Sequence, residues 1–323
     1  MPILFSRLAC VGRRAAGRFY AAIVPAFAAA VAVAACAARL ENDDSAAFPP
    51  ELVAFQAASG EPVFAGRGAG HWDARIRERG WILKEGDLWR MWYTGYADRT
   101  RMSLGYATSP DGLKWVRREE PLIDEFWVED MMIVVQDGTY WMFAEGLNDE
   151  AQLLSSKDGL AWTREGKLDI RKTDGTPISS GPYGTPTAWF ENGTWNLFYE
   201  RRDLGIWLAR SKDMKVWVNV QDDPVIALGP GKYDKAQVAM NQIVKHGGRY
   251  YAYYHGSGSE SRPQLWTTNV AVSDDLIHWT KYAGNPLFPE ADNLSSGILV
   301  HDGKQFRLYT MHDRVRVHFP RRP

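Results

Sequence analysis

Cysteine is scarce in this chain, which has two among its 323 residues, Cys10 and Cys36. Both lie near the N-terminus, so a disulfide framework is excluded from everything beyond Cys36. An excess of charge of one sign is also missing, because 38 basic and 39 acidic residues leave a formal net charge of −1. Nucleic-acid-binding domains carry a basic patch or stripe. This sequence lacks one, so we expect no nucleic-acid partner.

Long apolar runs are missing outside the N-terminus. Residues 21–35 are apolar and mostly small, and they follow the arginines at 7, 13, 14 and 18. This order is typical of a signal peptide, which we predict over residues 1–35. A membrane span is disfavoured, because fifteen residues are short for one and Pro25 interrupts them. Residues 36–58, with their Ala, Asp and Pro content, are predicted to be a tether.

The end of the apolar run, Val33-Ala34-Ala35-Cys36, resembles the lipobox of bacterial lipoproteins. In that case Cys36 carries the lipid, and the mature protein is a periplasmic or outer-membrane-tethered lipoprotein of a bacterium. The lipid is then its one link to the membrane. The alternative is an ordinary signal peptide cut at nearly the same place. Either cleavage removes four arginines and changes the formal net charge from −1 to −5.

A repeat dominates the rest of the chain. Its clearest copy, residues 128–162, has an apolar strand, an Asp137-Gly138 turn, an aromatic strand, a third strand and the box SKDGLAW. Asp-Gly between apolar runs is a strong hairpin signal, since both residues tolerate the positive φ of such turns. The hairpin glycine recurs at spacings of 52, 55, 55 and 55 residues, at Gly86, Gly138, Gly193, Gly248 and Gly303.

Further features recur with the glycine. The box is repeated as SPDGLKW, SKDMKVW and SDDLIHW, and short proline-containing strands follow as EPLI, DPVI and NPLF. About four strands in each repeat of this length indicate blades of a β-propeller. The fifth copy has no outer strand, but residues 61–64 (EPVF) match one that has no blade of its own. We therefore predict an all-β, five-bladed propeller over residues 59–323, with four-stranded blades and a ring closed by this N-terminal strand. We expect a monomer.

The register of the repeat predicts which side chains meet. In each blade the inner strand runs away from one face and the second strand returns to it. Residues eight before and seven after each hairpin glycine therefore share a rim. The titratable side chains at or near these positions are Glu78, Asp130, Glu145, Glu200, His255 and His312. Such groups are costly to bury without purpose and suit acid–base chemistry on a polar substrate. Alternatively, Asp130 and Glu145 bond to neighbouring backbone or to arginines such as Arg201.

Loops beside this rim offer further candidates. Asp73 precedes the first blade and could point into the cavity, while His71, Trp72 and Trp127 could stack on or bond to a sugar ring. Other tryptophans occupy fixed repeat positions and are predicted to be core: Trp89, Trp115, Trp141, Trp162, Trp217 and Trp279. The box aspartates are predicted to form turns: Asp111, Asp158, Asp213 and Asp275.

From about Glu61 to its end, the chain resembles the five-bladed propeller glycosidases around glycoside hydrolase families 43, 32, 68, 117 and 130. The resemblance rests on the blade repeat, the SxDGLxW boxes, the HWD loop ahead of RMWYTG, and FYERRDLGIWLARSKD. It implies that Asp73 is the base or nucleophile, with Glu78 as its rival, and that Asp130 orients substrate or tunes a neighbouring pKa. Residues 183–186 lack the acid that family 43 has there, so Glu200 replaces it as proton donor, with His255 or His312 as alternatives.

These features predict an exported hydrolase that cleaves glycosidic bonds of an extracellular carbohydrate. The resemblance to family 43 favours a reaction that inverts the configuration of the anomeric carbon. One alternative is a carbohydrate-binding propeller without catalysis. Another is a phosphorylase like those of family 130, with phosphate held by Arg75, Arg201 and Arg202. A calcium ion could be held by carboxylates with His255. No ligand spacing demands it, so neither a metal nor another cofactor is predicted.

Overall fold

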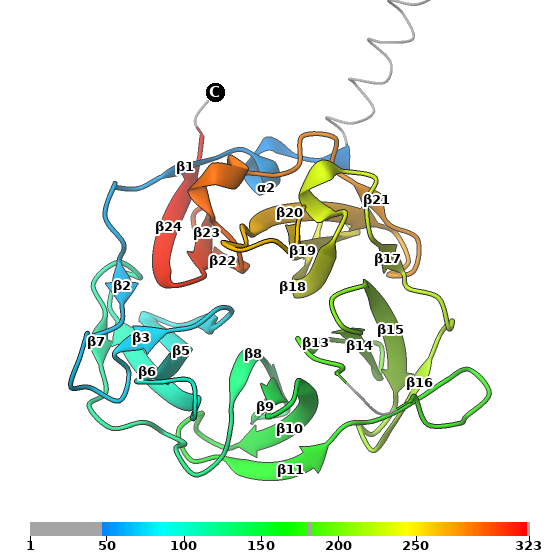
Figure 1. Cartoon of the computed structure of the whole chain (residues 1–323), viewed down its shortest axis with the longest axis horizontal. Coiled ribbons are helices and arrows are strands. Elements are labelled where there is room, and N and C mark those ends of the chain that lie inside the picture. The colour runs from blue at the N-terminus through cyan, green and yellow to red at the C-terminus, as the bar shows by residue number, and fades with distance from the viewer. Residues whose placement is uncertain (1–46, 180–181, 322–323) are drawn as a thin grey trace, which may run out of the picture. The chain divides into compact units, whose positions relative to one another are not determined.

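The computed structural model describes residues 47–179 and 182–321, in which five mainly antiparallel sheets form a ring (Figure 1). The predicted signal peptide and Cys36 lie outside the described residues. The all-β, five-bladed propeller expected from the repeat is confirmed. Among the described residues, no helix is long and apolar enough to cross a membrane.

Each blade is one sheet, and we number the blades I to V along the chain. Blade I has β3 (Arg75–Ile76), β4 (Trp81–Glu85), β5 (Leu88–Tyr96), β6 (Ser103–Ser109) and β7 (Val116–Arg117). Blade II has β8 (Glu129–Gln136), β9 (Thr139–Gly146), β10 (Glu150–Ser156) and β11 (Thr163–Lys167). Blade III has β12 (Asp169–Arg171), β13 (Thr187–Glu191), β14 (Thr194–Glu200), β15 (Gly205–Ser211), β16 (Val216–Asn219) and β17 (Ile226–Ala227).

Blade IV has β18 (Gln237–His246), β19 (Arg249–Ser257), β20 (Thr267–Ser273) and β21 (Thr280–Lys281). Blade V has β22 (Gly297–His301), β23 (Phe306–Met311) and β24 (Arg314–Pro320), joined by β1 (Phe55–Ala57) and β2 (Phe64–Ala65). Within the described residues, three short helices lie outside the sheets: α2 (Pro50–Val53), η1 (Lys232–Asp234) and η2 (Glu290–Asp292).

The hairpin turns have the geometry that their residues predict. Asp137 and Gly138 both have positive φ, at 50° and 67°, as the two-residue turn between β8 and β9 requires. The proline-containing segments pair with the third strand of their blade: β17 pairs with β15, and Ile123 forms a bridge with Leu104. These segments therefore pair with the part of the third strand that the short strand after each box leaves free.

The ring closes at blade V, where two N-terminal strands pair with β24. Phe64 of β2 lies opposite Val315, so the predicted closing strand is confirmed. Phe55 of β1 lies opposite Pro320, which the repeat did not indicate. Leu52 and Phe55 are buried, and the Tyr253 hydroxyl donates to the Leu52 carbonyl at 2.6 Å. The tether predicted over residues 36–58 is therefore corrected: from residue 47 onward this segment is packed on the propeller.

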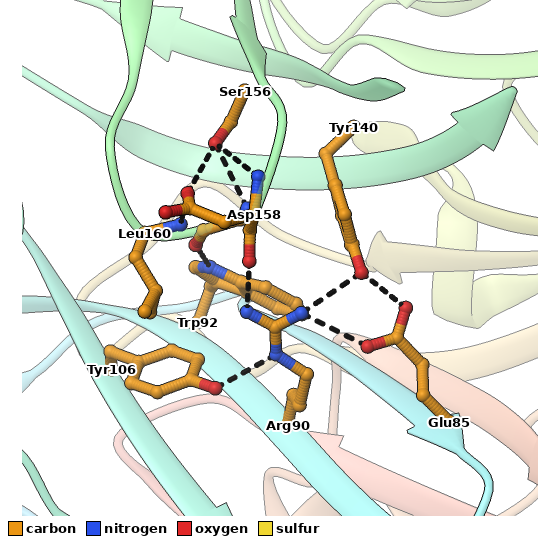
Figure 2. A network of polar contacts seen from close by, with 9 residues as sticks. Glu85, Arg90, Trp92, Tyr106, Tyr140, Ser156, Asp158 and Leu160 are labelled. Carbon is orange, nitrogen blue, oxygen red and sulfur yellow. Dashed lines mark hydrogen bonds and ion pairs between the residues drawn. The ribbon is translucent and has the colours of Figure 1, made fainter. Parts of the chain in front are cut away.

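The boxes connect neighbouring blades at the hairpin end of the ring. Asp158 Oδ1 accepts the N–H groups of Leu160 and Ala161, which confirms its turn-forming role. The Asp158 carbonyl in turn accepts a bond from Arg90 of blade I at 2.5 Å (Figure 2). Arg90 also donates to the Tyr106 and Tyr140 hydroxyls and pairs with Glu85. The box tryptophans pack in or against the core, as predicted.

Candidate active site

An axial cavity of about 450 Å³ lies at the face where the inner strands begin and the second strands end. Its carboxylates are Glu78, Asp130, Glu145, Asp149, Glu200, Asp203 and Asp313. Its basic and imidazole side chains are Arg77, Arg99, Arg202, Arg262, His255 and His312. All six titratable residues that the repeat register placed on one rim line this cavity. The wall is thus mainly polar, with both signs of charge.

The backbone around the cavity is strained. Five lining residues other than glycine have positive φ: Asp130, Asp149, Thr185, Arg202 and Asp203. Such conformations cost free energy, and they gather where a site needs side chains in fixed directions. The strain supports a functional role for this face.

A fully buried arginine, Arg79, lies beneath these residues. It donates to the Asp130 carbonyl, to the Pro186 carbonyl at 2.8 Å and to the Met240 carbonyl at 3.0 Å, and it also bonds the Thr187 hydroxyl. Burial lowers the pKa of Arg79 to about 10, so the guanidinium still carries its charge near neutral pH. It joins the starts of β8 and β13 to a residue within β18.

Asp130 is a buried carboxyl group whose backbone φ is 46°. Its Oδ1 has no hydrogen-bond partner among the described residues. Burial raises the pKa of Asp130 to about 8, and the negative charges of Glu78 and Glu129 act in the same direction, against Arg79 and Arg77. The group is therefore protonated at neutral pH and can donate a proton into the cavity.

Glu145 and Glu200 approach the loop before β13 from two sides. Glu145 Oε2 accepts the Thr185 N–H at 2.8 Å, and Glu200 Oε1 accepts the Gly184 N–H at 2.6 Å. Burial raises the pKa of both carboxyl groups, for Glu145 with help from the charge of Asp130. Glu200 Oε2 also accepts the Asp203 N–H, so two backbone donors favour its ionised form.

Asp203 lines the cavity but was not predicted. Burial, followed by the charge of Glu200, raises the pKa of Asp203 to about 8. Its Oδ2 accepts a bond from the Gln237 amide at 2.8 Å. The sequence signal that could have found it is the tetrapeptide from Glu200 to Asp203, in which four successive charged residues begin at the end of a strand and precede Leu204.

Two histidines complete the wall. His255 Nδ1 lies 2.9 Å from the Asn241 amide nitrogen, and its ring packs edge-on against Trp266. Burial lowers the pKa of His255 to about 4, so its imidazole is neutral at neutral pH. His312 Nδ1 lies 3.1 Å from the Ser295 hydroxyl and 3.9 Å from Glu78 Oε1.

Several predicted site residues lie away from the cavity. Asp73 is fully buried in blade I, where Arg67, Arg117 and the Tyr93 hydroxyl bond its carboxylate. Burial alone would raise the pKa of Asp73, but these three partners lower it below its ordinary value. Asp73 is thus a structural ion-pair centre, and the expectation that it points into the cavity is corrected.

The neighbours of Asp73 share its location. Trp72 stacks on Tyr93 and donates its indole N–H to the Glu119 carbonyl at 2.7 Å, and His71 is exposed outside the cavity. Arg201 bonds the Pro182 carbonyl and Ser179 rather than facing the cavity. Arg75 is also absent from the lining, whereas Arg202 belongs to it.

Trp127 lies just outside the cavity wall. Its indole N–H donates to Glu129 Oε1 at 2.6 Å, and Glu129 Oε2 lies 2.9 Å from Arg77 Nε. Among the described residues, oxygens of Glu129, Glu145 and Asp149 lie within 4.8 Å of one another, as a metal site requires. The carboxylate oxygens of Glu129 are engaged by Trp127 and Arg77, and one of Glu145 by Thr185. We therefore assign no metal to this cluster.

No protein-family model matches the chain. A 1,2-beta-oligomannan phosphorylase of Thermoanaerobacter sp. (strain X514) is 28% identical over 185 residues, which cover 53% of this chain and 58% of that protein. The match thus spans under two thirds of that relative. An uncharacterized protein of Mycobacterium tuberculosis (strain ATCC 25618 / H37Rv) is 23% identical over 222 residues, covering 61% of this chain and 73% of the other.

Solved structures have the same fold. A glycosyl hydrolase from Bacteroides ovatus superposes with a TM-score of 0.69 at 17% identity, covering 83% of this chain and 94% of that one. Beta-1,2-mannobiose phosphorylase from Listeria innocua, in complex with beta-1,2-mannobiose, has a TM-score of 0.63 at 13% identity and covers 82% and 95%. The chain therefore has the five-bladed fold of the glycosidase-like propellers, as the sequence resemblance predicted.

Proposed function

We propose that this protein cleaves glycosidic bonds in its axial cavity by hydrolysis. The observation that carries the proposal is Asp130, a buried carboxyl group with a pKa of about 8 that lines a polar cavity and has one oxygen without a hydrogen-bond partner among the described residues. A proton donor for a leaving sugar oxygen needs this raised pKa. The glycosidase-like propeller fold supports a glycosyl-processing enzyme, and the residues of the cavity support the choice of reaction.

Asp130 takes the role of general acid in this proposal. Glu200 and the histidines were the sequence-based candidates, but Glu200 accepts backbone N–H groups at both oxygens and His255 is neutral at neutral pH. Asp130 gives its proton to the glycosidic oxygen as the bond to the anomeric carbon breaks. Glu200 instead fixes the loops at Gly184 and Asp203.

Glu78 takes the role of base, because Asp73 lies outside the cavity. Glu78 is a cavity carboxylate, its side chain retains 23% exposure, and its charge acts on Asp130. In an inverting reaction it removes a proton from the water that attacks the anomeric carbon, while Asp130 protonates the leaving group. His312 lies beside Glu78, with its Nδ1 3.9 Å from Glu78 Oε1.

Phosphorolysis is a second candidate because of three arginines. Arg99, Arg202 and Arg262 line the cavity and are exposed, and guanidinium groups match phosphate geometry. A phosphate ion held there would replace water as the nucleophile, and Glu78 would not be needed as a base. The names of one relative and one structural neighbour also refer to phosphorylases of β-1,2-mannosides.

The test is product analysis with β-1,2-mannobiose and β-1,2-mannotetraose, with and without inorganic phosphate. Hydrolysis predicts mannose at a rate that phosphate does not change, and phosphorolysis predicts mannose 1-phosphate. Asp130→Asn should lower kcat about 10²- to 10⁴-fold in either case. Glu78→Gln should have a comparable effect in hydrolysis alone.

Glu120→Gln is the matched control, because Glu120 is an exposed carboxylate outside the cavity. Wild-type turnover in Asp130→Asn would refute the role of Asp130. Binding of either sugar without turnover would favour the carbohydrate-binding alternative.

Export remains part of the proposal. The apolar segment before Cys36 supports a secreted or lipid-anchored enzyme acting on extracellular carbohydrate. Hydrolysis suits that location, because the sugar phosphate made by phosphorolysis conserves energy only inside the cell.

A further inference from the structure

A groove of about 480 Å³ lies beside the axial cavity, between blades I and II. It is formed by the β5–β6 loop, the segment before β8 and the β9–β10 loop, with side chains of β11 on its outer side. In the described part of the chain, it shares no lining residue with the axial cavity, so the proposed reaction does not explain its presence.

The groove and the cavity are built from the same segments. In the β5–β6 loop, Arg99 lines the cavity and Thr100 lines the groove. In the β9–β10 loop, Asp149 lines the cavity, and the next residue, Glu150 at the start of β10, lines the groove. Adjacent residues thus line neighbouring hollows, which is the arrangement that a chain-like ligand extending from one to the other requires.

The groove combines apolar surface with hydrogen-bonding groups. Trp127 and Phe126 are half-buried along it, and Leu147 at the tip of the β9–β10 loop is 57% exposed. Arg101 and Asp124, which form an ion pair at 2.6 Å, provide polar groups beside them. Aromatic rings next to polar groups suit a sugar, which has apolar faces and a hydroxyl-bearing edge.

The aromatic surface is held in place before any ligand arrives. The Trp127 indole is fixed by Glu129, and the Trp127 carbonyl accepts a bond from Gln152 at 2.7 Å. Gln152 also accepts a bond from Arg164 Nε at 2.8 Å, and the Arg164 guanidinium lies 4.9 Å from the Phe126 ring centroid. A fixed surface loses little conformational entropy on binding.

We propose that this groove binds the sugar units of an oligosaccharide that extend beyond those in the axial cavity. The inference rests on the proposed glycoside-cleaving function and adds that the substrate is an oligosaccharide rather than a disaccharide. The Trp127–Glu129–Arg77 contacts connect the two hollows, because Arg77 lines the cavity. Longer substrates therefore gain contacts that a disaccharide in the cavity cannot make.

The experiment compares β-1,2-mannobiose with β-1,2-mannotetraose in the full chain, by kcat/KM and by calorimetric binding to the Asp130→Asn variant. The wild type should prefer the tetrasaccharide. Leu147→Ser should lower kcat/KM and affinity for the tetrasaccharide about three- to tenfold, the scale of one lost apolar side-chain contact, and leave the disaccharide unchanged. Leu147 is exposed, so the substitution should not affect folding.

Leu88→Ser is the matched control, because Leu88 is 44% exposed at the start of β5, by the hairpin at the other end of the blade. The groove proposal is wrong if mannobiose is cleaved with a kcat/KM equal to or above that of the tetrasaccharide. It is also wrong if Leu147→Ser lowers kcat/KM equally for both substrates. In either case the cavity proposal stands. If neither sugar is bound or cleaved, both proposals fail.

Discussion

Asp130 shows how one backbone position changes the chemistry of a side chain. Its carbonyl is bonded by the buried Arg79, and its φ of 46° lies in the left-handed region. The carboxyl group is thereby buried beside Glu78 and Glu129, whose charges add to the effect of burial in raising its pKa. An aspartate in an ordinary strand would be ionised at neutral pH and unable to donate a proton.

The ionisable carboxyl group of Asp130 should therefore support activity but lower the stability of the folded protein at high pH. Its ordinary pKa is 3.8 and its folded pKa is about 8, so between these values the folded state retains a proton that the unfolded state has released. Stability from this group falls as pH rises through that window. Asp130→Asn removes the charge, and the melting temperature of the variant should exceed that of the wild type by roughly 2–4 °C or more at the upper end of the window.

Thermal unfolding across the window measures this difference, and wild-type kcat/KM should fall as pH rises past about 8 because the acid loses its proton. Asp223→Asn, at an exposed aspartate, is the control and should follow the wild-type profile. Parallel melting profiles for the wild type and Asp130→Asn would contradict the raised pKa.

At the scale of elements, the inner strands are joined to one another at the floor of the cavity. Arg79, between β3 and β4, donates to carbonyls at the start of β8, just before β13 and within β18. One side chain thus connects blades I to IV below the proposed reacting groups. The positions of Asp130 and Thr185 depend on this connection.

Arg79→Met should therefore destabilise the protein by about 3 kcal/mol or more, because several buried carbonyl groups lose their donor at once. Urea unfolding of the full chain measures the loss as a lower midpoint. Arg99→Met is the control, since Arg99 is exposed at the cavity rim and its replacement should change stability by no more than about 0.5 kcal/mol. An unchanged urea midpoint in Arg79→Met would show that the hydrogen bonds of Arg79 do not contribute to the free energy of unfolding.

At the scale of the whole molecule, the ring places several blades around one cavity, and the fold itself does not choose the reaction. Propellers of this kind include both a glycosyl hydrolase and a mannobiose phosphorylase. The choice depends on whether Glu78 activates water or the arginines hold phosphate. Location in the cell is a separate property, and the proposal of export rests on the sequence before the propeller.

If Cys36 is lipidated, Cys36→Ser should move the protein from the membrane fraction to the soluble fraction of the producing bacterium. The reason is that, in this interpretation, the lipid on Cys36 is the covalent link between the protein and the membrane. Fractionation and immunoblotting of the full chain measure the change, with Cys10→Ser as the control. Membrane association that persists in Cys36→Ser would contradict the lipoprotein interpretation.

The repeat by itself determined the fold and much of the cavity wall. Hairpin glycines, boxes and strand lengths are local signals, and their period sets the number of blades and the face to which each strand end points. This register is why Glu78, Asp130, Glu145, Glu200, His255 and His312 were correctly placed together. It also identified β2 as the closing strand.

The tertiary structure alone decided what surrounds each charged group. Asp73 meets Arg117, which is 44 residues away, so its ion pairs have no signature in the neighbouring sequence. Asp203 and the packed segment from residue 47 to β1 also lay outside the repeat pattern and were missed. Burial and charge act through space, so the proton-donating role proposed for Asp130 could be distinguished from that of Glu200 only after the blades were assembled.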